Sequence, residues 1–411
     1  MSKFFINLHE AIFSLSDALD LVGVTHIHHG KRVAYMATEC GKYLGWTHQR
    51  MDKLFQAAIL HDCGVSRTSV HQRLAQLEWE NEGEHCLLGA ALLKTCPLME
   101  NLAPIVLHHH THWSVLKDLD LPEEVKLCAN CIYLVDRVDV LSLNFLIDES
   151  NLLLGREEIR NTILARRDDW FCPELVDAFL ALSNSEAFWL SLENEHVNGY
   201  VSVWLSETKT REMDFHELRS IVRIFSYIVD AKSSFTKSHS DGVAQLARHI
   251  GTLFNLSEER CEMLELAGLL HDIGKLRLPD QLLDKPGRLT AEEYIHIQRH
   301  SFDTYSIIKN VHGLEKISTW AAYHHERVDG SGYPYRLEGD GISLEARIVA
   351  VADVFQALAQ KRPYRAPLPK EEIMDILNTL VTNNKLDPEV VMCIDNHIDD
   401  CFAAAVTEFT I

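Results

Sequence analysis

Apolar residues recur at steps of three and four in two stretches of the chain. The first stretch follows His29 and consists of Val33, Met36, Ala37, Cys40, Tyr43 and Leu44. The second follows His239, 210 residues later, and consists of Val243, Leu246, Ala247, Ile250, Leu253 and Phe254. This spacing places the apolar side chains on one face of an amphipathic helix. The sequence therefore predicts two similar helices, one in each half of the chain.

Histidines and aspartates follow nearly the same register. The further pairs are His61 with His271, Asp62 with Asp272, His85 with His300 and Asp136 with Asp353, at offsets of 210, 210, 215 and 217. The run of three histidines at 108–110 corresponds to the pair His324-His325. A register kept over this length indicates an internal duplication. We expect an all-α protein of two related helical bundle domains.

A polar stretch separates the two copies. Residues 206–212 carry no apolar periodicity, so the boundary is placed there, with domains at 1–205 and 206–411. With 19 glycines and 11 prolines in 411 residues, the chain is poor in turn-forming residues. Thr290 followed by Glu293 has the pattern of a capping box, and Pro388 after Asp387 suits the first turn of a helix.

Charge excludes several classes of partner. The formal net charge is −21, which disfavours binding to a nucleic-acid polymer or to an anionic membrane surface. No signal-peptide core and no long uncharged apolar run is found, so neither secretion nor a membrane span is expected. The ten cysteines lack a disulfide-framework spacing, which favours a cytoplasmic location. Cys128 and Cys131 lie within an apolar helical pattern and are interpreted as core residues.

Metal-ligand side chains are concentrated in the second copy. They are His239, His271, Asp272, His300, His324, His325 and Asp353. Adjacent helical residues point about 100° apart, so this set forms one site only if several helices converge. Five imidazoles and two carboxylates exceed what one ion accepts and suit two ions joined by a bridging carboxylate. Ligands without a thiolate favour iron, manganese or zinc.

Three motifs carry a family resemblance. His271-Asp272-Ile273-Gly274-Lys275, His324-His325-Glu326 and the run Asp329-Gly330-Ser331-Gly332-Tyr333-Pro334 resemble the HD-GYP branch of the HD phosphohydrolase superfamily. The similarity extends over about residues 235–377 and involves five separated motifs in the same order. It implies an all-helical fold, two or three bound metals and hydrolysis of cyclic dinucleotides.

The resemblance also implies roles for individual residues. The seven residues above become the metal ligands, with Asp272 as the bridge. Lys275 is expected to act in catalysis, by orienting the nucleophilic hydroxide or stabilising charge on the phosphate. Arg362 and Arg365 resemble the basic pair that contacts phosphate in the family, which suits the planar guanidinium group.

Two positions depart from the family pattern. Members with three metals carry a glutamate four residues before the first ligand histidine, where this chain has Phe235. We therefore predict two divalent ions, iron or manganese. Thr304 stands where the family often has glycine, which affects the expected packing of the helix around it.

The first copy keeps the histidines and aspartates of the metal set but lacks the lysine, the Gly-Tyr-Pro run and the arginine pair. Its candidate second metal site consists of His29, His61, Asp62, His85, His109, His110 and Asp136. Val65 occupies the place of Lys275, and neither a Gly-Tyr-Pro run nor an arginine pair follows. We expect this domain to be catalytically weak or inactive and to serve regulation, dimerisation or structural support.

The tandem arrangement is similar to phosphodiesterases that act on 3',3'-cyclic GMP-AMP, while cyclic di-GMP is the commonest substrate class of the family. The leading interpretation is a metal-dependent phosphodiesterase that opens a cyclic dinucleotide to its linear form. Two alternatives stay open. One is a nucleotide phosphohydrolase of the wider superfamily, and the other is a non-catalytic adaptor that binds a protein such as a diguanylate cyclase. Whether the chain forms a homodimer is also left open.

Overall fold

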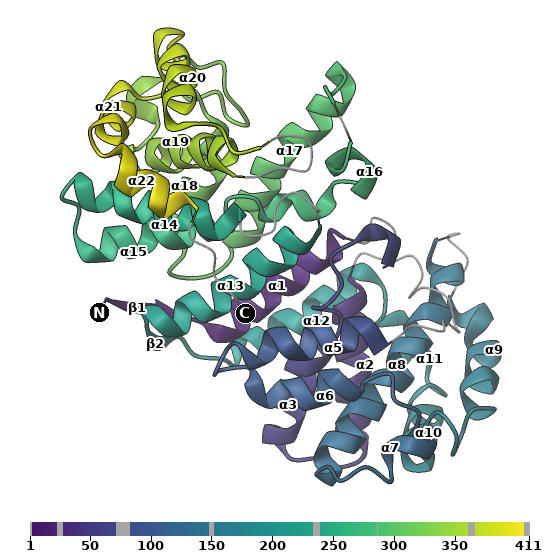
Figure 1. Cartoon of the computed structure of the whole chain (residues 1–411). Coiled ribbons are helices and arrows are strands. Elements are labelled where there is room, and N and C mark those ends of the chain that lie inside the picture. The colour runs from purple at the N-terminus through teal and green to yellow at the C-terminus, as the bar shows by residue number, and fades with distance from the viewer. Residues whose placement is uncertain are drawn as a thin grey trace. The chain divides into compact units, whose positions relative to one another are not determined.

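The computed structural model describes residues 2–22, 28–70, 83–147, 152–232, 239–285, 287–360 and 366–406 (Figure 1). The chain divides into two compact units. We call Leu8–Lys209 the N-terminal unit, and Met1–Asn7 together with Thr210–Ile411 the C-terminal unit. The division falls at Lys209, four residues after the end of the first predicted domain, and the first seven residues cluster with the second half of the chain.

The regular elements in the described part of the N-terminal unit are all helices. Its α-helices and one 3-10 helix (η1) are α1 (Leu8–Asp20), α2 (His29–Tyr43), α3 (His48–Leu60), α5 (Gly83–Lys94), η1 (Glu100–Leu102), α6 (Ala103–His108), α7 (Trp113–Leu116), α8 (Glu123–Ile147), α9 (Leu152–Leu164), α10 (Pro173–Leu182), α11 (Glu186–Leu190) and α12 (Asn194–Ser206). Helix α2 packs against α3 and α8. Val33, Met36, Ala37 and Cys40 of its predicted apolar stripe are buried, whereas Tyr43 is 57% exposed. Cys128 and Cys131 on α8 are both buried in the core.

The C-terminal unit is helical apart from two short strands. Its elements are β1 (Lys3–Ile6), β2 (Arg211–Asp214), α13 (Phe215–Lys232), α14 (His239–Leu253), α15 (Glu258–Leu270), η2 (Ile273–Arg277), α16 (Asp280–Leu283), α17 (Ala291–Ile308), α18 (Glu315–Ala322), η3 (Tyr323–His325), η4 (Gly339–Gly341), α19 (Leu344–Ala359), α20 (Lys370–Thr382), α21 (Pro388–Asn396) and α22 (Ile398–Ala405). Helix α14 packs against α15, α19 and α22 (Figure 1). The all-α prediction is confirmed.

The two strands form a small antiparallel sheet that the sequence did not predict. Lys3 pairs with Asp214, and Ile6 pairs with Arg211. Side chains alternate along β1, so that Phe4 and Ile6 are buried while Phe5 is exposed. The polar stretch at the predicted domain boundary therefore runs into a strand.

The duplication is visible in matched elements. Helices α2 and α14 each have 15 residues and begin at a histidine of the repeat. Helices α3 and α15 each have 13 residues and begin after an N-cap hydroxyl, from Thr47 and Ser257 respectively. Each of these hydroxyl groups accepts a hydrogen bond from a backbone N–H of its helix. Local sequence signals thus start the same helices in both units.

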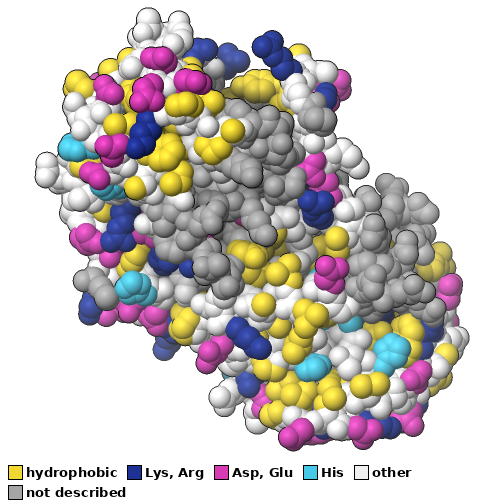
Figure 2. All heavy atoms as spheres, viewed as in Figure 1, with side chains coloured by type: hydrophobic (Ala, Val, Ile, Leu, Met, Phe, Trp, Pro, Cys, Tyr) yellow, Lys and Arg dark blue, Asp and Glu magenta, His cyan; other side chains and the backbone are white. Residues whose placement is uncertain are grey.

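The helix starts predicted in the C-terminal unit are present. Thr290 and Glu293 form the capping box of α17. Asp387 caps α21, and Pro388 is its first residue. Within the described residues, the helices are too short or too polar to cross a membrane. Acidic side chains are interspersed with lysine and arginine on the face seen in Figure 2.

Candidate metal centre

The C-terminal unit brings the seven predicted side chains into one cluster, called the pocket below. One group consists of His239, at the start of α14, His271, just after α15, and Asp353, on α19. Their ligand atoms all lie within 4.8 Å of one another. The Nε2 atom of His239 is 3.3 Å from Oδ1 of Asp353. Three segments far apart along the chain thus converge on one point.

A second group lies next to the first. It contains His300, on α17, with His324 and His325, both in η3. The Nε2 atoms of His300 and His324 are 3.3 Å apart. This is about the separation of two imidazole ligands on one ion with metal–nitrogen distances of about 2.0 Å. Each group therefore has the dimensions of a site for one ion.

Asp272 stands between the two groups. Its Oδ2 atom is 3.3 Å from Nε2 of His271, and its Oδ1 atom is 3.5 Å from Nε2 of His300. The two carboxylate oxygens therefore face different groups of histidines. This is the arrangement expected of a carboxylate that bridges two ions.

Backbone carbonyls orient the imidazoles. A carbonyl oxygen only accepts, so each ring donates from Nδ1 and keeps its Nε2 lone pair free to face the centre. The three bonds run from His271 to Gly268, from His300 to Ile297 and from His324 to Ala321, at 2.7, 2.6 and 2.6 Å. In each case the accepting carbonyl lies three residues before the histidine. The local helical backbone therefore fixes the orientation of each imidazole ring.

His239 is oriented by a side chain instead. Its Nδ1 atom donates to Oε1 of Gln356 over 2.5 Å, and Nε2 of Gln356 donates to the carbonyl of Ala405 over 3.4 Å. Gln356 is not among the site residues predicted from the sequence. Its position could have indicated this role, because Gln356 lies three residues after Asp353 on the same helix and therefore on the same face.

Burial and charge set the protonation of the pocket. Burial lowers the pKa of His300 to about 4 and holds the pKa values of His324 and His325 well below the ordinary range. Burial acts in the same direction on His271, but Asp272 and Asp353 outweigh it and raise the pKa of His271 to about 9. Burial would raise the pKa of Asp272, but His271 and Lys275 hold it well below its usual range.

Two buried atoms of the pocket suit a bound cation. Nε2 of His271 and Oδ1 of Asp272 make no hydrogen bond to the described residues. Buried polar atoms are normally satisfied, so such atoms need a partner that the chain does not supply. Imidazole and carboxylate donors in this number fit divalent transition-metal ions. The pocket is therefore chemically suited to hold metal.

Lys275 lies at the edge of the pocket. It belongs to η2, and its Nζ atom makes a short contact with Oδ2 of Asp272. The Lys275 side chain is 24% exposed. Lys275 is therefore positioned beside Asp272, at the edge of the cluster.

Gly274 allows close packing behind the pocket. A Cβ at this position would lie 2.0 Å from the carbonyl oxygen of His300. Thr304 connects the same two segments, because its hydroxyl accepts from the N–H of Gly274 and donates to the carbonyl of His271, at 3.1 and 3.0 Å. The threonine that departs from the family pattern thus fastens α17 to the turn after α15.

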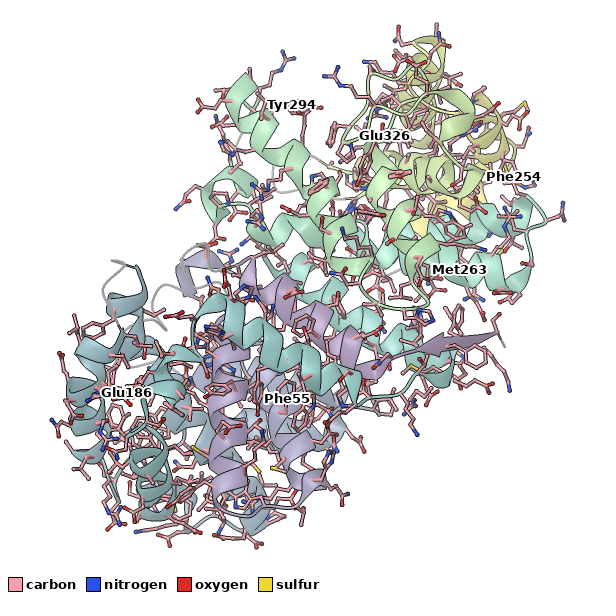
Figure 3. All side chains as sticks on the ribbon, turned by 180° about the vertical axis from the view of Figure 1, so that it is seen from behind. Phe55, Glu186, Phe254, Met263, Tyr294 and Glu326 are labelled. Carbon is pink, nitrogen blue, oxygen red and sulfur yellow. The ribbon has the colours of Figure 1, made fainter. Side chains whose placement is uncertain are left out.

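The Gly-Tyr-Pro loop is held by Glu326. This buried carboxylate accepts from the backbone N–H groups of Tyr335 and Leu337 at 2.7 and 2.9 Å. The Tyr333 ring lies 4.8 Å from the ring of His325 and packs edge-on to Tyr294 of α17 at 6.2 Å. Glu326 and Tyr294 are labelled in Figure 3. The loop therefore borders the second group of histidines.

Gly330 and Gly332 serve the backbone of this loop. Gly330 has φ of +73°, a conformation that side chains with a Cβ rarely adopt. A Cβ on Gly332 would lie 2.4 Å from the backbone nitrogen of Arg327. Glycine is thus required at Gly330 by the backbone conformation and at Gly332 by the close approach of another backbone segment. Arg362, Arg365 and Phe235 lie outside the described residues.

The N-terminal unit assembles an equivalent cluster. Nε2 of His29 is 3.3 Å from Oδ1 of Asp136, as in the corresponding pair of the other unit. Nε2 of His85 is 3.2 Å from Nε2 of His109 and 3.4 Å from Oδ1 of Asp62. His61 and His110 complete the set. Of the three consecutive histidines, His109 and His110 face the cluster and correspond to His324 and His325.

Cations surround the N-terminal cluster differently. Asp139 accepts from Nδ1 of His29 at 2.7 Å and is paired with the Arg32 guanidinium. Arg137 lies 2.7 Å from Oδ2 of Asp136. Val65 is buried where the other unit has a lysine. A guanidinium group therefore already occupies one oxygen of Asp136.

Comparison with known proteins accounts for both clusters. HD-domain family models match residues 27–141 and 223–390. Over 410 residues the chain is 37% identical to the 3'3'-cGAMP-specific phosphodiesterase 1 of Vibrio cholerae, which covers 98% of this chain and 94% of that protein. The chain belongs to the HD-domain family of cyclic dinucleotide phosphodiesterases. The family resemblance seen in the motifs is confirmed.

Further members of the family match different parts of the chain. A crystal structure of a cyclic GMP-AMP specific phosphodiesterase from V. cholerae covers 97% of this chain and 98% of that one, with a TM-score of 0.66 and 25% identity. A cyclic di-GMP phosphodiesterase response regulator of Xanthomonas campestris is 40% identical over 39% of this chain, which is 42% of that protein. The tandem arrangement therefore extends over nearly the full length of the first of these relatives.

Proposed function

We propose that the C-terminal unit hydrolyses a 3',3'-cyclic dinucleotide, in the first place cyclic GMP-AMP, to the linear dinucleotide. The observation that carries the proposal is the position of Asp272, whose two oxygens face separate histidine groups 3.3 and 3.5 Å away. A pocket divided in this way suits a pair of ions about 3.5–4 Å apart, which is the spacing used for in-line phosphoryl chemistry.

We propose that the two bound ions are iron or manganese. His239, His271 and Asp353 would hold one ion, and His300, His324 and His325 the other, with Asp272 shared. Imidazole and carboxylate ligands without a thiolate support this choice. When bound, such ions supply Lewis acidity to a phosphate and lower the pKa of a water molecule to near neutrality.

Lys275 is proposed to assist the chemical step directly. Its ammonium group is held beside Asp272, and the Lys275 side chain is 24% exposed. A fixed positive charge there stabilises the negative charge that grows on the phosphate oxygens as the 3' oxygen departs. Arg362 and Arg365 are proposed to bind the phosphates of the substrate by bidentate contacts.

The substrate preference is proposed from the relatives. The relative that matches the chain over nearly its full length is named for 3'3'-cGAMP, which favours cyclic GMP-AMP. The relative named for cyclic di-GMP matches a shorter part of the chain, so cyclic di-GMP is the second candidate. A cytoplasmic location follows from the proposed substrate class.

Paired substitutions in the two units test the assignment. In the full chain, His271→Ala with Asp272→Ala should abolish turnover of cyclic GMP-AMP. The matched change, His61→Ala with Asp62→Ala, should leave turnover within about threefold, because it removes the same side chains from the other cluster. Product formation is followed by chromatography after anaerobic loading with iron(II) or manganese(II), with cyclic di-GMP compared in parallel.

The outcomes separate the alternatives. Equal loss of turnover from both pairs would overturn the assignment to the C-terminal unit. Hydrolysis of mononucleotides in preference to both cyclic dinucleotides would support a nucleotide phosphohydrolase instead. A chain that hydrolyses neither class but retains a diguanylate cyclase on a column would be an adaptor.

A further inference from the structure

We propose that the N-terminal unit holds a metal centre of a different kind, a closed zinc site in which Cys86 is a thiolate ligand together with His85, His109 and His110. The proposal concerns a cluster outside the proposed catalytic unit and stands independently of turnover. It assigns a metal and a structural function to the half of the chain that lacks the catalytic lysine.

The distances around Cys86 match a zinc site. Its Sγ atom is 3.6 Å from Nε2 of His85 and 3.9 Å from Nε2 of His109, and those two nitrogens are 3.2 Å apart. A tetrahedral zinc ion, with bonds of about 2.3 Å to sulfur and 2.0 Å to nitrogen, separates its sulfur and nitrogen ligands by about 3.6 Å. Two nitrogen ligands are separated by about 3.3 Å in the same geometry.

The ligand residues are buried, and a backbone hydrogen bond orients His109. His85, Cys86 and His109 are 4%, 2% and 0% exposed, so water does not compete for them. Nδ1 of His109 donates to the carbonyl of Val106 at 2.6 Å, which leaves the Nε2 lone pair for the ion. With His110 included, all four ligand atoms lie within 4.8 Å of one another.

The thiol distinguishes this cluster from the C-terminal pocket. Ser301 takes the equivalent position there, one residue after His300, and its hydroxyl lies 3.3 Å from Nε2 of that histidine. A thiol loses its proton readily to a bound zinc ion, whereas a serine hydroxyl is a weak ligand. Binding therefore releases the Cys86 proton to solvent and forms a zinc–sulfur bond without any redox change.

Charge at the cluster suits a divalent ion. Asp62, Asp136 and a Cys86 thiolate are negative, and Arg137 contributes one positive charge within 2.7 Å of Asp136. Four protein ligands also leave no open coordination position, which is typical of structural zinc sites.

The sulfur ligand can be observed directly. The full chain carrying His271→Ala, Asp272→Ala, His300→Ala and His324→Ala is stripped of metal and reloaded with one equivalent of zinc, so that both histidine groups of the C-terminal unit are disabled and the N-terminal cluster is intact. X-ray absorption at the zinc edge should show one sulfur neighbour. Adding Cys86→Ser should remove that neighbour and lower zinc affinity at least about 10-fold, while manganese affinity changes less than about threefold.

Cys63→Ser is the matched control. Cys63 is also buried in this unit, but its Sγ atom donates to the carbonyl of Gly89 at 3.7 Å. The control should keep the sulfur neighbour and the zinc affinity. A zinc shell without sulfur in the parent chain would overturn the proposal, and so would a sulfur neighbour that persists after Cys86→Ser. The parent spectrum decides the question even if the variant does not fold.

Discussion

Asp139 and Gln356 hold equivalent positions in the two units, because each accepts a hydrogen bond from Nδ1 of the histidine that begins the first helix of its cluster. The two distances are 2.7 and 2.5 Å. Arg32 balances the carboxylate in the N-terminal unit. The corresponding residue of the other unit is Gly242, where a Cβ would lie 2.8 Å from the Gln356 side chain. The N-terminal unit thus orients its histidine with a carboxylate paired to an arginine. The C-terminal unit orients the equivalent histidine with a neutral amide that packs beside a glycine.

Gln356→Leu tests this orienting role. The substitution removes the acceptor that fixes His239, so affinity for the metal held by that histidine should fall about 10- to 100-fold. Affinity is measured by competition with a chromophoric chelator. Gln245→Leu is the control, since it removes a hydrogen bond to Glu265 within the same unit but away from the pocket. Equal losses in both variants would mean that Gln356 contributes only to folding.

Lys275→Ala separates catalysis from metal binding. The ammonium group contacts Asp272 but supplies no lone pair to an ion, so metal content should stay unchanged. We expect kcat to fall about 10²- to 10³-fold, as for loss of one electrostatic stabiliser of a transition state. Metal per chain and kcat are measured on the same preparation. Lys285→Ala, which removes an ion pair with Glu293, should leave both values near wild type. Loss of metal from the Lys275 variant would contradict the assigned role.

Gly274→Ala should damage the pocket through the backbone. The new Cβ would lie 2.0 Å from the carbonyl oxygen of His300, and backbone atoms cannot yield as a flexible side chain can. We expect a loss of about 2–4 kcal/mol in the free energy of unfolding, together with weaker metal binding. Urea denaturation measures the first effect. Gly341→Ala is the control, because its Cβ meets only Leu337 at an ordinary 3.8 Å. Wild-type stability in the Gly274 variant would show that the two segments separate easily.

Asp230 makes the stability of the C-terminal unit depend on pH. Burial raises the pKa of Asp230 from its ordinary value of 3.8 to about 8, in spite of hydrogen bonds from Ser240. Between these two values the folded state keeps a proton that the unfolded state has lost. The contribution of Asp230 to stability therefore falls as pH rises from about 4 to 8 and is constant above that range.

Asp230→Asn should remove this dependence. Relative to the wild-type chain, the variant should gain about 2–5 kcal/mol in the free energy of unfolding between pH 5 and pH 8.5. Urea denaturation at the two pH values provides the comparison. Asp395→Asn alters an exposed aspartate of the same unit. Its free energy of unfolding should change with pH as that of the wild-type chain does. If the stability of Asp230→Asn changes between the two pH values by the same amount as that of the wild-type chain, Asp230 is ionised over this whole pH range.

The repeat accounts for most of what was predictable. An offset of 210 to 217 residues relates helices and histidines of the two halves, and it predicted both the all-α fold and the seven side chains of each cluster. Periodicity works for these features because the spacing of residues within one helix fixes the face on which they lie. The capping signals at Thr290 and Asp387 are local for the same reason.

Contacts between distant segments were decided by the tertiary structure. The pairing of Lys3 with Asp214, the support of His239 by Gln356 and the approach of Cys86 to His109 join residues whose partners no local pattern specifies. The sequence by itself determined which side chains each helix presents and that they recur twice. Only the packing of helices against one another decided which atoms meet, because that depends on the volumes and charges of residues far apart along the chain.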